Sequence, residues 1–188
     1  MIKLLFTGGG GAGNASIYRT LGDRYEMHFA DADGLAMDPV LPRDRCHPIP
    51  MANSGHFVSG VSRLCAAQGI DVVIPGVDEE LPRIPEVVAC TEGLDALLPD
   101  ASYVTRMLDK LTMAEALKAA GLPVPDTATA ARGRTGGFPC IVKPRHGRGS
   151  RGVQVLQRAE QVAAYVLLSG LDPEQIILQD LQEGQEYT

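Results

Sequence analysis

The chain has 188 residues, enough for one ordinary domain or two small ones. Its composition, 45% hydrophobic and 21% charged, is typical of a soluble globular protein. A formal net charge of -6 and a pI of about 5.2 argue against a general nucleic-acid binder, whose domain is usually basic. The sequence has no run near the roughly 20 apolar residues of a membrane span, and its first apolar run is too short for a signal peptide. We therefore expect a cytoplasmic protein that binds neither membranes nor nucleic acid.

The four cysteines are spread along the chain, at positions 46, 65, 90 and 140. They form no C-x-x-C pair, so the sequence indicates neither a zinc site nor a redox pair. We expect reduced thiols and no metal site built from this chain.

The first hundred residues alternate between strand and helix patterns. The predicted strands are short and apolar, and they cover residues 3–7, 25–33, 71–76 and 95–100. The predicted helices cover residues 14–22, 54–69 and 78–90. Residues 39–50 contain four prolines and are predicted to form a loop or an irregular edge segment. This alternation favours a parallel sheet with helices on both faces.

The pattern changes near residue 105, where we place a domain boundary. Residues 105–121 are predicted to form one long amphipathic helix that ends at Gly121. An extended segment over residues 122–127 follows, because its two prolines disfavour a helix. The remaining predicted elements are strands over 138–144 and 152–157, a helix over 158–170 and a strand over 175–181. The two strands around residue 147 are expected to pair as a hairpin rather than through a crossover.

The first glycine-rich loop lies between a predicted strand and a predicted helix. Its spacing, Gly8-x-Gly10-x-x-Gly13, matches a dinucleotide-binding fingerprint, and Asp31 and Asp33 end the next strand, where a ribose-binding acid is required. Two alternatives stay open. The glycines allow a tight turn from strand to helix, or the loop holds a carboxylate or phosphate of a substrate at the helix N-terminus. The residues of this predicted anion site are Gly10, Gly11, Gly13 and Asn14.

The second glycine-rich loop, residues 147–152, lies between two predicted strands, so it is not a dinucleotide turn. It also lacks the Gly-Lys-Ser/Thr of a Walker loop, and Lys143 precedes it, whereas a protein kinase has its lysine after the loop. Residues 132–158 contain six arginines and Lys143 but no acid, which points to an anionic ligand such as phosphate. The alternatives are a solvated basic hairpin or RNA binding, although Phe138 is the only aromatic residue nearby.

Three segments of the second half carry a family resemblance: DKLTMAEALKAAGLPVPDT, GFPCIVKPRHGRGSRGVQVL and IILQDLQEGQEYT. They resemble the ATP-grasp superfamily, and most of all its members similar to the carbamoyl-phosphate synthase large chain. The earlier PGVDEELPRIPEV resembles part of the Rossmann-like domain that precedes ATP-grasp in that group. The resemblance implies an α/β fold in two parts. Residues 1–104 would form the Rossmann-like, parallel-sheet pre-ATP-grasp domain. Residues 105–188 would form an incomplete α+β ATP-grasp domain, with its N-terminal subdomain and the start of its C-terminal subdomain.

The resemblance also implies a set of ATP-binding residues. Two lysines would contact the phosphates, the second glycine loop would close over them, the strand near residue 180 would face the adenine, and Glu186 would bind the ribose hydroxyls. The implied residues are Lys110, Lys143, Gly147, Gly149, Ser150, Arg151, Gly152, Gln179, Asp180, Leu181 and Glu186.

The implied activity is that of an ATP-dependent ligase, which joins a small carboxylate or bicarbonate to an amine or ammonia through an acyl phosphate. ATP and Mg²⁺ are the expected cofactors. The catalytic residues and metal ligands are expected beyond Thr188, so we expect a fragment, a truncated form or half of a split gene, completed by a homodimer partner or another chain. The alternatives are an NAD-linked oxidoreductase that uses residues 8–13, or a nucleotide-binding module without catalysis.

Overall fold

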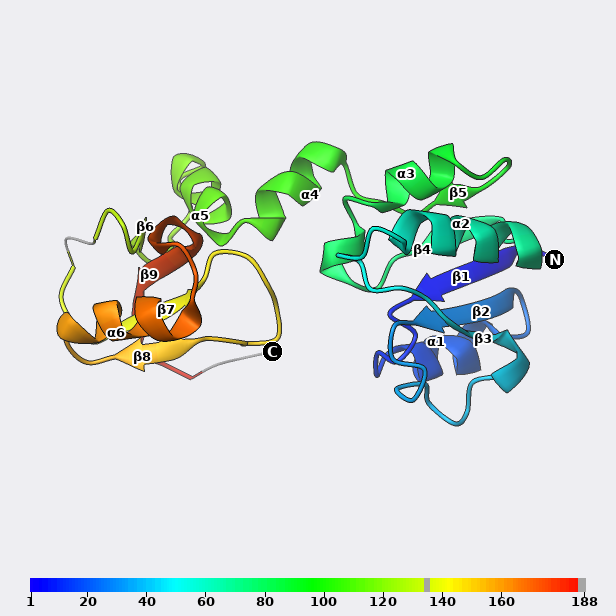
Figure 1. The fold of residues 1–188 in the computed structure, drawn as a ribbon, viewed down its shortest axis with the longest axis horizontal. Helices are drawn as coiled ribbons and strands as arrows, with labels where there is room; N and C mark the ends of the chain where they lie inside the picture. The colour runs from blue at the N-terminus through cyan, green and yellow to red at the C-terminus, as the bar shows by residue number, and fades with distance from the viewer. Residues whose placement is uncertain (134–135, 186–188) are drawn as a thin grey trace. The chain divides into compact units, whose positions relative to one another are not determined.

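The computed structural model describes residues 1–133 and 136–185. The chain divides into two compact units, Met1–Ala101 and Ser102–Thr188, and each contains a sheet of its own (Figure 1).

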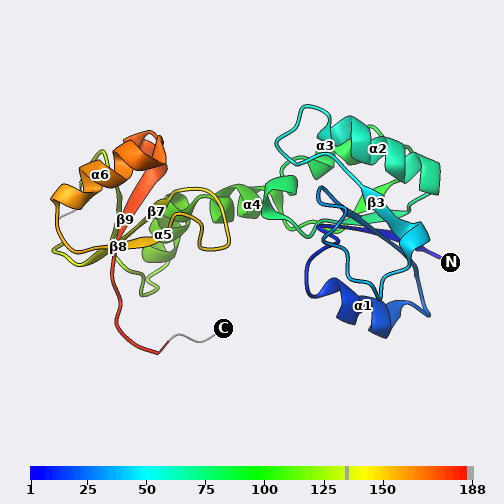
Figure 2. The same ribbon diagram turned by 60° about the horizontal axis from the view of Figure 1, so that its bottom comes forward.

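Unit 1 is built on a parallel sheet with the strand order β3-β2-β1-β4-β5. Its strands are β1 (Lys3–Thr7), β2 (Glu26–Asp31), β3 (Cys46–Pro48), β4 (Val72–Ile74) and β5 (Asp95–Ala96). Its helices are α1 (Asn14–Leu21), α2 (Phe57–Gln68) and α3 (Ile84–Ala89), with single 3-10 turns η1 (Arg43–Arg45) and η2 (Asp78–Glu80). Helix α1 covers one face of the sheet, and α2 and α3 cover the other (Figures 1 and 2).

The two faces are explained by the alternation of side chains along the strands. Leu5 and Val73 are fully buried in the cluster that contains α2 and α3, whereas Leu4 and Phe6 belong to the cluster that contains α1. Because both faces of the sheet are covered, β1 and β4 consist mainly of apolar residues.

Two segments of unit 1 differ from the sequence prediction. Within the proline-rich stretch, Cys46–Pro48 form a short edge strand beside β2. The helix predicted over 78–90 is divided into η2 and α3. Pro82 and Pro85 lack the N–H groups that a continuous helix needs for its i→i−4 hydrogen bonds. Helix α3 therefore starts only at Ile84, with Pro85 in its first turn, where no such hydrogen bond is needed.

Unit 2 is built on an antiparallel sheet with the strand order β6-β9-β7-β8. Its helices are α4 (Ala101–Leu108), α5 (Lys110–Ala119) and α6 (Glu160–Ser169), with the 3-10 turn η3 (Pro173–Gln175). Its strands are β6 (Thr127–Thr129), β7 (Cys140–Pro144), β8 (Gln154–Leu156) and β9 (Ile176–Asp180). Strands β7 and β8 form the predicted hairpin, and Tyr165 of α6 packs against the sheet with Cys140 and Val142.

The prediction of one long helix over residues 105–121 is wrong, because the helix breaks at Asp109. This residue has an extended backbone, with φ −104° and ψ 107°, and it caps α5. Its carboxylate accepts hydrogen bonds from the backbone N–H groups of Leu111 and Thr112, at 3.0 and 3.3 Å. The predicted fold class, a parallel α/β unit followed by an α+β unit, is confirmed.

Candidate functional site

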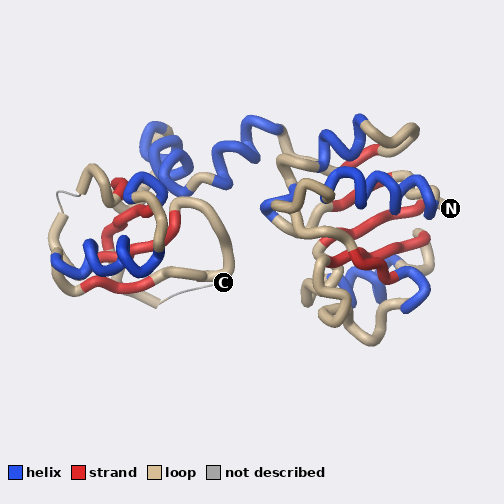
Figure 3. The backbone as a smooth tube through the Cα atoms, in the orientation of Figure 1, coloured by secondary structure: helices blue, strands red, loops and turns tan. Residues whose placement is uncertain are grey.

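The second glycine loop connects β7 to β8 (Figure 3), and its backbone has an unusual conformation. Its φ angles are 107° at Gly147, 65° at Gly149, 54° at Ser150 and 72° at Gly152. L side chains rarely adopt such values, so three of these four positions favour glycine for conformational reasons. Ser150 adopts the left-handed region with a side chain, which costs energy.

This loop forms one side of a cavity of about 220 Å³. The described residues that line it include four cations and no acid: Lys110, Lys143, Pro144, Gly147, Arg148, Gly149, Ser150, Arg151 and Val153. The structure therefore brings together six of the residues predicted to bind ATP. A cavity whose charged lining is entirely cationic in a chain of net charge -6 attracts anions.

Lys110 is placed by the cap of α5 and by the end of β7. Its backbone N–H donates to the carbonyl of Arg145 at 3.1 Å. Its ammonium group donates to the carbonyl of Gly147 at 2.6 Å and reaches the carbonyl of Arg145 at 3.4 Å. The charge of Lys110 thus lies at the entry to the glycine loop.

Lys143 extends from β7 on the sheet face opposite the cluster that contains α6. Its ammonium group donates to the Gln179 side-chain carbonyl at 2.8 Å, and the Gln179 amide donates to the Thr127 hydroxyl at 2.8 Å. Burial lowers the pKa of Lys143, and the nearby positive charge of Lys110 lowers it further. An anion bound between the two lysines would offset this repulsion.

A pair of residues that the sequence analysis missed connects these elements. The Arg145 guanidinium donates two hydrogen bonds to the Asp109 carboxylate, Nε to Oδ1 at 2.8 Å and a terminal nitrogen to Oδ2 at 2.6 Å. Arg145 holds the pKa of Asp109 well below its usual range. His146 also lies near this carboxylate, with Nε2 3.9 Å from Oδ2. The sequence signal that could have indicated the role of Asp109 is its position directly before Lys110, because aspartate favours the N-cap position of a helix.

The other described residues predicted to bind ATP do not line this cavity. Gly152 contacts Tyr165 of α6, whose hydroxyl donates to the Gly152 carbonyl at 2.6 Å. Asp180 ends β9, where its backbone N–H donates to the Asp126 carbonyl at 3.0 Å, and Leu181 follows it half-buried. The predicted ribose ligand Glu186 lies outside the described residues.

The first glycine loop is held by internal contacts in unit 1. The Gly10 N–H donates to the Asp31 carboxylate at 2.9 Å, and the other oxygen of Asp31 accepts from the Asp33 N–H at 2.9 Å. A Cβ added at Gly10 would lie 2.5 Å from the Cβ of Ala36, so close packing against the chain accounts for this glycine. The Asn14 amide donates to the carbonyl of Gly8, at 2.9 Å. These contacts support the structural explanation of the loop.

The anion site predicted at this loop stays a prediction. The Gly11 N–H donates to the Gly8 carbonyl at 2.9 Å, whereas Gly13 is open, with no heavy atom within 4 Å of an added Cβ.

Over residues 1–133 and 136–185, no three His, Cys, Asp or Glu side chains gather in a way that could hold a metal ion. No helix in the same part of the chain has the length and apolar character needed to cross a membrane.

Comparison with known proteins gives a family match for most of the second unit. A family model described as "ATP-grasp domain" matches residues 107–188. No curated protein sequence matches the chain. The fold is similar to three solved structures in particular. The L-amino acid ligase from Bacillus licheniformis has a TM-score of 0.67 and 19% identity, with 98% of this chain and 45% of that chain covered.

The biotin carboxylase domain of 2-oxoglutarate carboxylase from Hydrogenobacter thermophilus has a TM-score of 0.66 and 15% identity, covering 97% of this chain and 45% of that chain. The N5-carboxyaminoimidazole ribonucleotide synthetase from Thermotoga maritima has a TM-score of 0.62 and 18% identity, covering 96% of this chain and 46% of that chain. The chain therefore spans less than half the length of these three structures. Residues 107–188 thus match the ATP-grasp domain model, and the chain as a whole shares its fold with these three solved structures.

Proposed function

We propose that this chain is the nucleotide-binding part of an ATP-dependent carboxylate–amine or carboxylate–ammonia ligase. The observation that supports this proposal best is the cavity beneath the second glycine loop, where Lys110 and Lys143 meet Arg148 and Arg151. The finer assignment, to ligases similar to the carbamoyl-phosphate synthase large chain, rests on sequence resemblance and is part of the proposal.

In the proposed site the lysines hold the phosphates of ATP. The Lys143 ammonium group would exchange the Gln179 carbonyl for a phosphate oxygen, and Lys110 would do the same with the carbonyl of Gly147. Both exchanges replace a neutral acceptor with an anionic one, which makes a stronger hydrogen bond. The backbone N–H groups of the glycine loop would close over the same phosphates.

The proposed reaction transfers the γ-phosphate of ATP to a carboxylate or to bicarbonate, and an amine or ammonia then displaces phosphate from the acyl phosphate. The positive charges of this cavity would hold the ATP phosphates in place while the negatively charged carboxylate or bicarbonate approaches the γ-phosphate. The biotin carboxylase domain mentioned above was solved with MgADP and bicarbonate. The described residues of this chain contain no acidic cluster that fits Mg²⁺, and we assign no step to the metal.

The adenine and ribose would lie toward the end of β9, where we propose that Gln179, Asp180 and Leu181 offer groups to the base and Glu186 binds the ribose hydroxyls. Before ATP binds, Gln179 would keep Lys143 oriented, because its side-chain amide joins that lysine to Thr127.

Equilibrium binding of ATP and of ADP to the chain tests the proposal. We expect the Lys143→Ala variant to bind ATP about 10- to 100-fold more weakly, because one charge-assisted hydrogen bond contributes about 1.5–3 kcal/mol. Calorimetric titration measures the dissociation constants.

A matched control is Lys118→Ala, at the other end of helix α5. Lys118 forms an exposed ion pair with Asp126 at 2.7 Å and does not line the cavity. We expect this variant to bind ATP like the original chain. Equal binding by the Lys143 variant would contradict the proposal, and binding of NADH in preference to ATP would favour an oxidoreductase instead.

A further inference from the structure

The glycine loop, residues 147–152, is tied to the rest of unit 2 at both of its ends. At its start, the Lys110 ammonium group donates to the Gly147 carbonyl at 2.6 Å. At its end, the Tyr165 hydroxyl donates to the Gly152 carbonyl at 2.6 Å. The two ties differ in kind, because the lysine faces the cationic cavity whereas the tyrosine comes from the core beneath α6.

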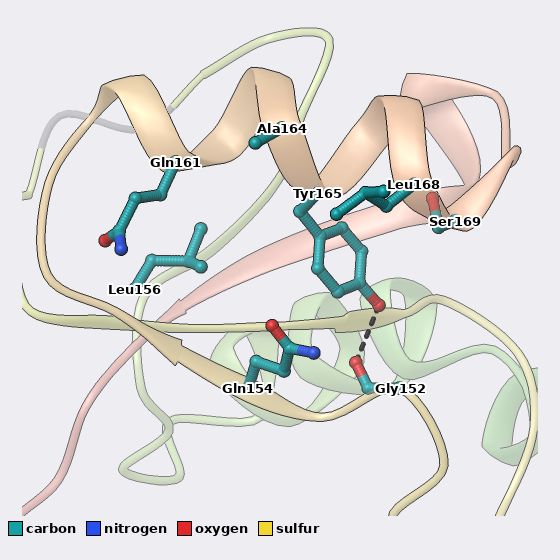
Figure 4. A pocket seen from close by; sticks show the side chains of 8 residues that line it. All are labelled: Gly152, Gln154, Leu156, Gln161, Ala164, Tyr165, Leu168 and Ser169. Atoms are coloured by element: carbon teal, nitrogen blue, oxygen red, sulfur yellow. Dashed lines mark hydrogen bonds between the residues drawn. The ribbon is translucent and has the colours of Figure 1, made fainter.

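The tie at Gly152 comes from a largely buried side chain. Tyr165 is 8% exposed and belongs to the hydrophobic cluster of Cys140, Leu156 and Ile176, so its ring is fixed by packing. Figure 4 shows the ring extending from α6 toward the sheet, with its hydroxyl directed at Gly152. The Tyr165 hydroxyl is protonated at neutral pH and can donate, and burial raises its pKa further above the ordinary value of 10.0.

The backbone at Gly152 is also closely packed. Its φ is 72°, and an added Cβ would lie 3.1 Å from the Tyr165 hydroxyl and 3.1 Å from two ring carbons of Pro144. The loop therefore leaves the core at a point that is enclosed on two sides. Gly149 differs, because no heavy atom lies within 4 Å of an added Cβ there.

We propose that Tyr165 is a positioning residue for the glycine loop, which pivots at Gly152 when it closes over the phosphates of a nucleotide. This inference rests on the proposed function. Nucleotide phosphates would compete for Lys110 and so release the first tie, whereas the second tie lies outside the phosphate cavity and is kept. The Tyr165 hydroxyl thus fixes the end from which the loop moves, although it touches no substrate atom.

The Tyr165→Phe variant of the full chain tests this role, because it keeps the ring and removes the hydrogen bond. We expect the backbone amide of Val153, which donates to the Ser150 carbonyl at 3.2 Å, to exchange with solvent about 5- to 10-fold faster in the variant. We also expect ATP to dissociate several-fold faster, measured by stopped flow. NMR-detected hydrogen exchange measures the exchange rates of the loop amides. The amides of β7 and β9 serve as an internal reference, because we expect their rates to change little.

The control variant is Ile176→Val, which removes one methylene group from the same hydrophobic cluster at a position in β9, outside residues 147–152. We expect it to lower the stability of unit 2 and to leave both Val153 exchange and ATP dissociation unchanged. The proposal is overturned if Tyr165→Phe changes neither quantity, or if Ile176→Val changes both to the same extent. Failure of the original chain to bind ATP would overturn the proposed function, and the exchange comparison without nucleotide would still decide whether Tyr165 holds the loop.

Discussion

At the scale of single residues, Lys143 has the most informative environment in the cavity. Burial and the charge of Lys110 both lower its pKa below the ordinary lysine value of 10.5. Lysine binds phosphate only in its charged form, so ATP binding and proton binding at this residue support each other.

We therefore predict that ATP affinity falls as the pH rises through the lowered pKa of Lys143, below the pH at which ordinary lysines titrate. Titrations across this range measure the effect, and the Lys143→Gln variant should bind weakly with little pH dependence in the same window. If ATP affinity depended on pH equally in the original chain and in this variant, another group would be responsible.

In the free chain, the stability of the fold depends on pH in the opposite direction from ATP affinity. Because its folded pKa is lowered, Lys143 makes the free energy of unfolding rise between that pKa and 10.5.

At the scale of elements, the Asp109–Arg145 pair joins the start of α5 to the end of β7. Its side chains are only 13% and 22% exposed, and the Asp109 carboxylate also caps α5. The pair thereby sets the position of Lys110 against the glycine loop.

We predict that Asp109→Asn lowers the free energy of unfolding by about 1–3 kcal/mol, because the asparagine keeps a capping oxygen but loses the charge pair. Urea denaturation measures the loss, and Lys118→Gln, which breaks an exposed ion pair, should cost clearly less. The contribution of Asp109 is present above the ordinary aspartate pKa of 3.8 and is lost as the pH falls through its lowered folded value. A loss that does not diminish at acidic pH would contradict this assignment.

The sequence analysis predicted elements well where a local pattern decides them. The apolar strands of both sheets and the glycines that end α2 and α6 are examples, since each depends on side-chain alternation or on a left-handed residue at the helix end. The break at Asp109 was missed, because the same residues also suit a continuous amphipathic helix and the partner that favours the break, Arg145, is distant in sequence. The tie between Tyr165 and Gly152 was missed because a tyrosine in an apolar helix gives no local sign of its hydrogen-bond partner.

At the scale of the whole chain, the hydrophobic clusters are each confined to one unit. Two clusters lie within Met1–Ala101, one on each face of the parallel sheet, and the third lies within Ser102–Thr188. A ligand stabilises only the part of a protein that unfolds together with its binding site. This separation makes the proposed location of the ATP site testable without any substitution in unit 1.

We predict that saturating ATP slows hydrogen exchange in β7 and β9 of unit 2 but leaves β1 and β4 of unit 1 unchanged. At an ATP concentration about 100 times the dissociation constant, the added stability is about 2.7 kcal/mol, which corresponds to a slowing of about 100-fold for amides that exchange by unfolding of unit 2. Mass spectrometry of peptides from both units measures the effect, and the Lys143→Ala variant should lose most of it. Protection of β1 that persists in this variant would instead place the nucleotide at the first glycine loop, beside Gly10 and Asp31, because only a site in unit 1 that does not need Lys143 could produce it.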